Sequence, residues 1–348
     1  MTTTVHNVVR AVLYEGYNLY PYRRSVKSQR RWMFGVLYPR AYSEACGGSD
    51  PCSMQTQCLI EAAGATEVDI EVQFLHLVER RVAQVGGDDP RDERNWTFVE
   101  ALELNGSLYQ SWQEATERTV PCGVLGLSML AERPATTHFE FPAWREIEEV
   151  YDAEGRAAAI ILHEQQAVEG CVECAAEHMA ADQVRLTVRI ENTTTGPANE
   201  RLHRNDAPLC AFVSTHTILE ARDGEFVSLI EPPAALCGEI NRLSNQGTWP
   251  VLVGEEGRRD TMLSSPIILY DYPQIAAESP GELFDSTEID EILALRVMTL
   301  TDDEKRQMRG VDERTRALLE RTETLPAEQM AKLHGAIRSL QRVTQGDS

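Results

Sequence analysis

The sequence predicts an α+β fold, with an antiparallel β-sandwich-like core and a C-terminal helical module. Three observations support this prediction. Apolar and polar residues alternate with period two through much of residues 56–231, which is typical of half-buried strands. Clusters of glycine, proline and asparagine that favour tight turns separate the strand candidates. From residue 286 onward the apolar period becomes that of an amphipathic helix.

An aromatic and basic segment, residues 1–55, begins the chain and is expected to pack on the core. It holds a dense tyrosine cluster beside a locally basic island. Aromatic rings and arginines are enriched where protein interfaces gain most of their binding energy. The candidates for partner contacts are Tyr17, Tyr20, Tyr22, Arg23, Arg24 and Trp32. Alternatively, the tyrosines cover the core and the arginines pair with acids of the same chain.

The antiparallel β domain is expected over residues 56–231. Residues 68–74 (VDIEVQF) and 184–190 (VRLTVRI) alternate between apolar and polar types, as half-buried strands do. Turn signals at Asn105-Gly106 and Asp223-Gly224 lie between strand candidates. Such strands without regular helices between them favour an antiparallel sandwich or barrel. The further strand candidates are 97–104, 107–112, 157–168, 209–219 and 225–230.

Residues 232–285 lose the alternation and are expected to form an ordered irregular segment. A proline or glycine recurs every few positions, as in GTWPVLVGEEGRRD. Trp249, Tyr270 and Tyr272 argue against disorder, because disordered segments are poor in aromatic residues. We therefore expect this segment to pack across the surface of the sheet.

Helices are expected over residues 286–348. Thr301 and Glu304 have the spacing of a capping box, and Pro326 fits the first turn of a last helix. Apolar residues then recur at three- and four-residue intervals. These helices would form a C-terminal module that folds onto the sandwich or is offered to a partner.

The charge of the chain limits its partners. Its 33 Lys and Arg residues against 55 Asp and Glu give a formal charge of −22, which disfavours nucleic acid and anionic membranes. No apolar run approaches the roughly 20 residues that span a bilayer, and MTTTVHNVVR lacks the features of a secretory signal. We therefore expect a cytoplasmic protein with no membrane insertion and no nucleic-acid partner.

The stretch GCVECAAEHM, residues 170–179, has a C-x2-C-x3-H spacing that suggests zinc. In a strand, Cys171 and Cys174 point to opposite faces, and Cys174 and His178 stand about 13 Å apart. In a helix the three share one stripe, but the outer two are separated by about 10 Å of rise. Zinc–ligand bonds of roughly 2.0–2.3 Å fit neither arrangement well. We favour a strand without metal, and these three residues remain the alternative ligand set.

A second cysteine cluster, Cys46, Cys52 and Cys58, lies in a loop rich in glycine and proline. Such a loop could bring three thiols to a soft metal or an iron–sulfur cluster. The spacing matches no common cluster motif and no fourth ligand is evident, so we predict no cofactor. In a reducing compartment most of the eight cysteines are expected to be free thiols.

Sequence signatures of catalysis are missing. The chain has no glycine-rich phosphate loop ending in Lys-Ser or Lys-Thr, no G-x-G-x-x-G and no G-x-S-x-G. An enzyme with its site between the sandwich and the irregular segment would use His216, Glu220 or Asp271 as acid or base. Only the residue types support that hypothesis, so a protein without catalytic activity is favoured.

A dense acidic run surrounds two tyrosines in the irregular segment. It would dock a basic partner and speed the encounter, or it is a solvated acidic face at the start of a helix. The residues proposed for contacts are Tyr270, Asp271, Tyr272, Glu278, Asp285 and Glu288.

Four runs of the sequence stand out for their aromatic, arginine or acidic residues. They are LYEGYNLYPYR and WMFGVLYPRAY near the start, VSTHTILEARDGEFVSLIEPP at 213–233, and GTWPVLVGEEGRRDTMLSSPIILYDYPQIAAESPGELFDSTEIDEILALRVMTLTDDEK at 247–305. They resemble an uncharacterised bacterial protein family associated with gene clusters for nickel-iron hydrogenases, especially the oxygen-tolerant uptake type of actinobacteria and their relatives. The resemblance carries over no catalytic residue.

The resemblance implies a non-catalytic accessory or assembly protein of a nickel-iron hydrogenase system. Such a protein would bind a hydrogenase subunit or a maturation factor through protein–protein contacts. The contact surface would combine the tyrosines and arginines of the N-terminal segment with the acidic run. The alternative is a metal- or iron-sulfur-binding protein that uses its cysteines for metal delivery or electron transfer.

Overall fold

A 33-residue strand, β1 (Ser53–Val85), organises the molecule. The computed structural model describes residues 3–18, 33–87, 89–180, 182–195 and 206–274, together with Lys305, Leu319 and Glu320. These residues form mostly antiparallel β structure with few helices, so the prediction of a β-rich fold is confirmed. The other strands are β2 (Trp96–Val99), β3 (Ala101–Leu104), β4 (Ser107–Gln110), β5 (Trp112–Gly126), β6 (Ala135–Phe141), β7 (Trp144–Tyr151), β8 (Ala157–Gln165), β9 (Val168–Ala180), β10 (Gln183–Asn192), β11 (Val213–Phe226), β12 (Trp249–Leu252) and β13 (Thr261–Ser265). The helices are α1 (Thr3–Asn18), α2 (Arg40–Ala45), α3 (Leu127–Glu132) and α4 (Cys237–Ile240), with 3-10 turns at Glu93–Asn95 and Ala207–Cys210.

The two edges of β1 pair with different strands. Its first part pairs with β10 and its middle part pairs with β5, while β11 pairs with both parts. Ile60 and Glu61 pair with β10 and β11 at once, so those strands lie on opposite edges. The middle of β1 likewise lies between β5 and β11. β5 and β10 therefore share one edge of β1, and a register shift between Ala62 and Glu67 falls between them.

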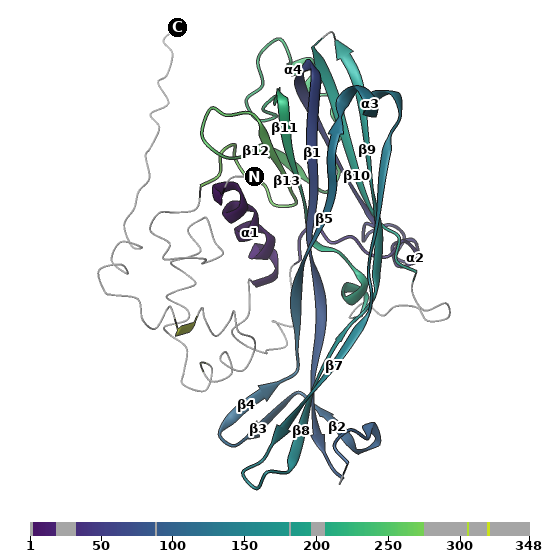
Figure 1. The fold of residues 1–348 in the computed structure, drawn as a ribbon, viewed down its shortest axis with the longest axis vertical. Coiled ribbons are helices and arrows are strands. Elements are labelled where there is room, and N and C mark those ends of the chain that lie inside the picture. The colour runs from purple at the N-terminus through teal and green to yellow at the C-terminus, as the bar shows by residue number, and fades with distance from the viewer. Residues whose placement is uncertain are drawn as a thin grey trace, which may run out of the picture.

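The sheet curls into two layers around the main core, the buried cluster that includes Ile60, Ile70, Phe74, Leu186 and Phe212 (Figure 1). One layer runs β5, β1, β11, β13 and β12, and the other runs β1, β10, β9 and β6. β10 buries every second residue from Val184 to Ile190, as its sequence predicts. Leu127 and Leu130 of α3 close the same core. Because both layers share β1, the core is enclosed by one continuous sheet.

Four phenylalanine rings join the two layers inside this core. Phe74 on β1 lies 4.6 Å from Phe212 and 5.9 Å from Phe141 between ring centroids. Phe139 lies 5.3 Å from Phe212. β9 passes close to these rings at Gly170, where an added Cβ would lie 2.4 Å from Phe139 Cζ and 2.9 Å from a backbone oxygen. A side chain at this position would displace the rings or the strand.

Helix α1 covers the outer face of β11 and β13. Four valines of α1, spaced three and four residues apart, are buried against Ile218, Val253 and Leu263. Leu13 and Tyr14 lie against the outer face of β1. The sequence prediction missed this helix, because valine is a modest helix former and the helix depends on tertiary burial.

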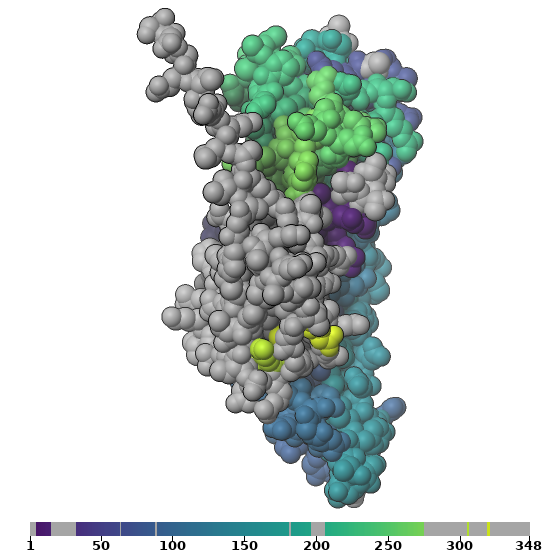
Figure 2. Space-filling view, turned by 90° about the vertical axis from the view of Figure 1, so that its left-hand side faces the viewer, coloured from purple at the N-terminus to yellow at the C-terminus, as the bar shows by residue number. Residues whose placement is uncertain are grey.

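An arm extends beyond the main core at the end of the molecule opposite α3 and α4 (Figures 1 and 2). We define the arm as β2, β3, β4, β7, β8 and the last part of β1, residues 79–85, which pairs with β8 and β2. β3 and β4 form a hairpin closed by Asn105 and Gly106, with φ of 53° and 77°. This is the two-residue turn that the dipeptide predicts.

Several predicted strand boundaries differ from the structure. The predicted strands 97–104 and 157–168 each cover parts of two strands, β2 and β3 in the first case and β8 and β9 in the second. Asp223 and Gly224 lie inside β11 opposite the register shift of β1, not in a turn between two strands. Asp223 has a φ of 54°, a conformation that serves an irregularity in a strand as well as a hairpin turn. The strand predicted at 209–219 begins at Val213, after a 3-10 turn.

The segment 232–285 contributes two strands that its proline and glycine content concealed. β13 pairs with β11, and β12 pairs with β13 at the edge of the sheet. Pro250 is tolerated within β12 because an edge strand leaves one row of backbone groups without sheet partners. The predicted C-terminal helical module lies outside the described residues except for Lys305, Leu319 and Glu320.

Candidate functional site

The basic half of the predicted contact surface lies almost wholly outside the described residues. Tyr17 belongs to α1, but its side chain is not among those that the structure describes. Tyr20, Tyr22, Arg23, Arg24 and Trp32 also lie outside it. Of the predicted acidic half, the structure describes Tyr270, Asp271 and Tyr272, whereas Glu278, Asp285 and Glu288 fall outside.

Asp271 fixes the chain where the acidic run begins. Its Oδ1 accepts the backbone N–H of Leu252 at 2.8 Å, and its Oδ2 accepts the hydroxyl of Ser228 at 2.5 Å. Tyr272 follows with its N–H bonded to the Leu252 carbonyl and its hydroxyl donating to the Arg258 carbonyl at 2.9 Å. Tyr272 has a φ of 55°, which costs conformational energy in a non-glycine residue. These hydrogen bonds hold the segment against β12 and the loop that follows it.

The residues just before Asp271 alternate between burial and exposure. Ile267 and Leu269 pack against the cluster beneath α1, whereas Ile268 is 74% exposed and Tyr270 is 84% exposed. We call Ile268 and Tyr270 the apolar pair. Tyr270 was predicted as a contact residue and Ile268 was not, although a period-two pattern in PIILYDY places both on the same side. Two large exposed side chains on a segment fixed at both ends are the clearest candidate contact in the described chain.

Replacing Asp271 by alanine is expected to lower the free energy of unfolding by about 2 kcal/mol, because two hydrogen bonds to a charged acceptor are lost. Asp271→Asn should lose less, since its amide oxygen still accepts one bond. Urea unfolding measures both values, and hydrogen exchange at the Leu252 amide should quicken in the alanine variant. Equal stability of wild type and Asp271→Ala would contradict this role.

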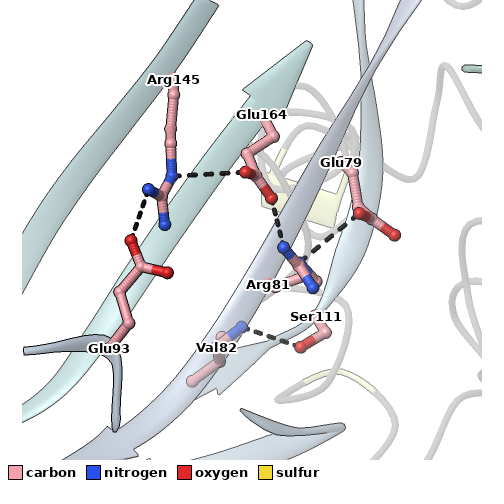
Figure 3. A network of polar contacts seen from close by, with 7 residues as sticks. All are labelled: Glu79, Arg81, Val82, Glu93, Ser111, Arg145 and Glu164. Carbon is pink, nitrogen blue, oxygen red and sulfur yellow. Dashed lines mark hydrogen bonds and ion pairs between the residues drawn. The ribbon is translucent and has the colours of Figure 1, made fainter. Parts of the chain in front are cut away.

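A second surface feature is a ladder of ion pairs on the arm (Figure 3). Arg145 on β7 lies between two carboxylates, with distances of 2.6 Å to Glu93 and 3.3 Å to Glu164. Glu164 on β8 also pairs with Arg81 of β1, which lies 3.5 Å from Glu79. Each arginine therefore lies between acids of different segments. Pairs this exposed are each worth about 0–1 kcal/mol, so the ladder orients the arm more than it stabilises it.

Aromatic rings lie beneath the arginines of the ladder. The guanidinium of Arg81 is 4.4 Å from the ring centroid of Phe98, and that of Arg145 is 5.6 Å from Trp96. Phe98 remains 46% exposed. Burial is the main cause that raises the pKa of Glu79, against the opposing effect of Arg81. Because these cations are already paired and stacked, the ladder has the features of a structural network rather than of a catalytic centre.

The stretch GCVECAAEHM lies in strand β9, as predicted. Cys174 is buried in the main core, whereas Cys171 lies on the other face and His178 is exposed. Cys171 and Cys174 lie opposite Glu191 and Val188 of β10, three register positions apart. The structure therefore does not bring the three residues of the C-x2-C-x3-H spacing to one point.

The other cysteine cluster is also divided. Cys46 follows α2, Cys52 precedes β1, and Cys58 lies in β1 with its side chain buried in the main core. Burial raises the pKa of Cys58, which favours the neutral thiol over the thiolate that binds metal. Within the ranges that the structure describes, no three His, Cys, Asp or Glu side chains are grouped to hold a metal ion.

The residues considered for acid–base chemistry have separate surroundings. His216 is fully buried, with Nδ1 2.7 Å from the Ser214 carbonyl oxygen and Nε2 3.2 Å from Ser265 Oγ. Burial lowers its pKa to about 4. Glu220 lies about 13 Å further along β11 at the usual rise, and Asp271 is engaged in fixing its own segment. His216 thus serves as a neutral hydrogen-bonding residue of the core.

Among the helices of the described chain, none has the length and apolar character needed to cross a membrane. Comparison of the sequence with models of known protein families and with curated proteins found no match in either set.

Proposed function

We propose that this chain is a non-catalytic accessory protein of a nickel-iron hydrogenase system and binds a hydrogenase subunit or a maturation factor. The sequence runs that resemble the hydrogenase-associated family support the choice of partner. The observation that carries the binding role is the apolar pair, Ile268 and Tyr270, exposed on a segment that Asp271 and Tyr272 fix to the sheet.

A fixed segment suits a binding surface for an energetic reason. Ordering a loose loop on binding costs free energy, whereas a segment already held by hydrogen bonds avoids most of that cost. Tyrosine is among the residues that contribute most to interface affinity, because its ring buries a large area and its hydroxyl still finds a partner. An exposed tyrosine beside an exposed isoleucine therefore supports a protein partner.

The charge of the chain supports a partner with a basic surface. A formal charge of −22 attracts such a partner over a distance set by the ionic strength and speeds the encounter. The binding rate should therefore fall as salt is raised, while contacts made by the apolar pair should depend less on salt.

The test is co-purification from cells that express the hydrogenase. A tagged full-length chain is expected to recover a hydrogenase subunit or maturation factor, identified by mass spectrometry. The affinity for that component, measured with purified proteins, should fall by about 30-fold in an Ile268→Ala, Tyr270→Ala double variant, the loss expected for an interface hot spot.

Tyr151 offers a matched control, because it is 53% exposed but lies on the arm. Tyr151→Ala should bind as wild type does. Recovery of no hydrogenase component, under conditions in which the enzyme is present, would contradict the choice of partner. Equal binding by the double variant would contradict the role of the apolar pair.

A further inference from the structure

Cys122 and Cys174 meet inside the main core although they belong to different layers of the sheet. Cys122 lies on β5 and Cys174 on β9, and these strands are not paired with each other. The side chains of Cys174 and of Thr137 on β6 lie within hydrogen-bonding reach of the Cys122 sulfur. Two thiols and a hydroxyl from three strands thus converge at this point.

A local irregularity of β5 directs Cys122 toward this point. Gly123 pairs with Ile70 and Pro121 pairs with Glu71, so Cys122 is the extra residue of a β-bulge and has no partner on β1. Gly123 has a φ of 82°, a conformation that suits glycine. Bulges redirect side chains and occur often next to functional sites. The bulge places the Cys122 side chain against the main core, to which Cys174 also belongs.

The two thiols differ in exposure and in acidity. Cys122 is half-buried, whereas Cys174 is 1% exposed. The hydrogen bond from Cys174 lowers the pKa of Cys122, against burial and the nearby carboxylates of Asp69 and Glu71. The same bond, together with burial, raises the pKa of Cys174. Burial also raises the pKa of Cys210 to about 11, so the environment of Cys122 differs from that of a thiol simply buried in the core.

We propose that Cys122 is an oxidation site that reacts with hydroperoxides and then forms a disulfide with Cys174. In the first step the Cys122 sulfur attacks a peroxide oxygen, the O–O bond breaks, and Cys122 becomes a sulfenic acid while the peroxide is reduced to water or an alcohol. In the second step the Cys174 sulfur attacks the Cys122 sulfur. The S–OH bond breaks, and the hydroxide leaves as water with the proton of the Cys174 thiol. One hydroperoxide is consumed for each disulfide formed.

The disulfide would connect the two layers of the sheet at a point where no backbone hydrogen bonds join them. It would close the loop between β5 and β9, which contains α3, β6 and the arm strands β7 and β8. Closing a loop of this length restricts the unfolded chain strongly. Oxidised protein should therefore unfold at a higher urea concentration than reduced protein.

The test is titration of the full-length protein with hydrogen peroxide at neutral pH, followed by alkylation of free thiols and peptide mapping without reductant. The expected product is a linked pair of peptides that contain Cys122 and Cys174, in a protein lighter by two hydrogen atoms. Cys174→Ser should instead hold Cys122 as a sulfenic acid that dimedone labels, and Cys122→Ser should prevent both products.

Cys237→Ser is the matched control, because Cys237 is also half-buried but lies on α4. This variant should still form the linked peptides. The wild-type measurement needs no variant to fold, so it decides the proposal by itself. Cys122 that stays reduced, or that oxidises to the sulfinic acid without a link to Cys174, would overturn the proposal.

Discussion

Acidification from pH 7 to pH 5 is expected to lower the free energy of unfolding by about 4 kcal/mol, because two buried histidines stay neutral in the folded protein. Burial is the main cause that lowers the pKa of His216 to about 4. Burial also lowers the pKa of His76 to about 4, and the Arg118 guanidinium adds to the effect. Each histidine accounts for about 2 kcal/mol of the loss at pH 5.

The direction of this change follows from which state binds the proton. Below the ordinary histidine pKa of 6.5 the unfolded chain takes up a proton at each site, whereas the folded chain does so only near pH 4. The contribution of the two histidines to the free energy of unfolding is therefore complete above pH 6.5 and decreases as the pH drops toward 4. Below pH 4 the histidines cause no further loss. The groups that face His216 are the Ser214 carbonyl and the Ser265 hydroxyl, neither of which supplies a negative charge.

The measurement is urea unfolding at several pH values between 7 and 5, a range above the ordinary pKa of carboxylates. His216→Gln and His76→Gln should each reduce the difference between pH 7 and pH 5 by about 2 kcal/mol. His178→Gln is the control, because His178 is exposed on β9 and should leave that difference unchanged. An unaltered pH dependence in both buried variants would show that other groups cause the loss.

Alternation predicted some of the strands whose two faces differ, such as β10, but missed β6, whose burial also alternates. β9 and β10 have one face in the core and one face largely outside it, so period two is visible in their sequences. β1 is different, because Phe74 faces the main core while Leu75 and Leu77 lie under α1 on its outer face. A strand covered on both faces loses the alternation. The length of β1 therefore could not be predicted from its sequence pattern. That pattern also did not indicate which five strands pair with β1.

Long-range contacts decided what local sequence left open. Asp223-Gly224 favours a positive φ in either a turn or a strand irregularity, and only the register with β1 distinguishes the two. The approach of Cys122 to Cys174 depends in the same way on a bulge and on the curl of the sheet. By contrast, the exposure of Tyr270 was predictable from its place in an aromatic and acidic run. Sites made by one segment can be predicted more readily than sites made by several.

Replacing Phe74 by alanine is expected to lower the free energy of unfolding by about 4 kcal/mol, a large share of the stability of an ordinary domain. Phe74 is fully buried and contacts the rings of Phe139, Phe141 and Phe212. β1 and β6 share no backbone hydrogen bonds among the described strands, so side chains such as these hold the two layers together. Removing the central ring leaves a cavity and takes away its aromatic contacts at once.

Phe74→Leu and Phe98→Ala separate the effect of the core from that of ring size. Leucine fills part of the space, so Phe74→Leu should lower the free energy of unfolding by less than half as much as Phe74→Ala. Phe98→Ala on the arm should lower it by under about 1 kcal/mol, because Phe98 is 46% exposed. Urea unfolding with unchanged denaturant dependence would give the three values on one scale. If Phe74→Ala and Phe98→Ala lost the same stability, the layers would be held together by something other than this cluster. The expected order would instead show that the ring cluster joins β1 to β6. The same rings account for the glycine at position 170 of β9, where an added Cβ would lie 2.4 Å from Phe139 Cζ.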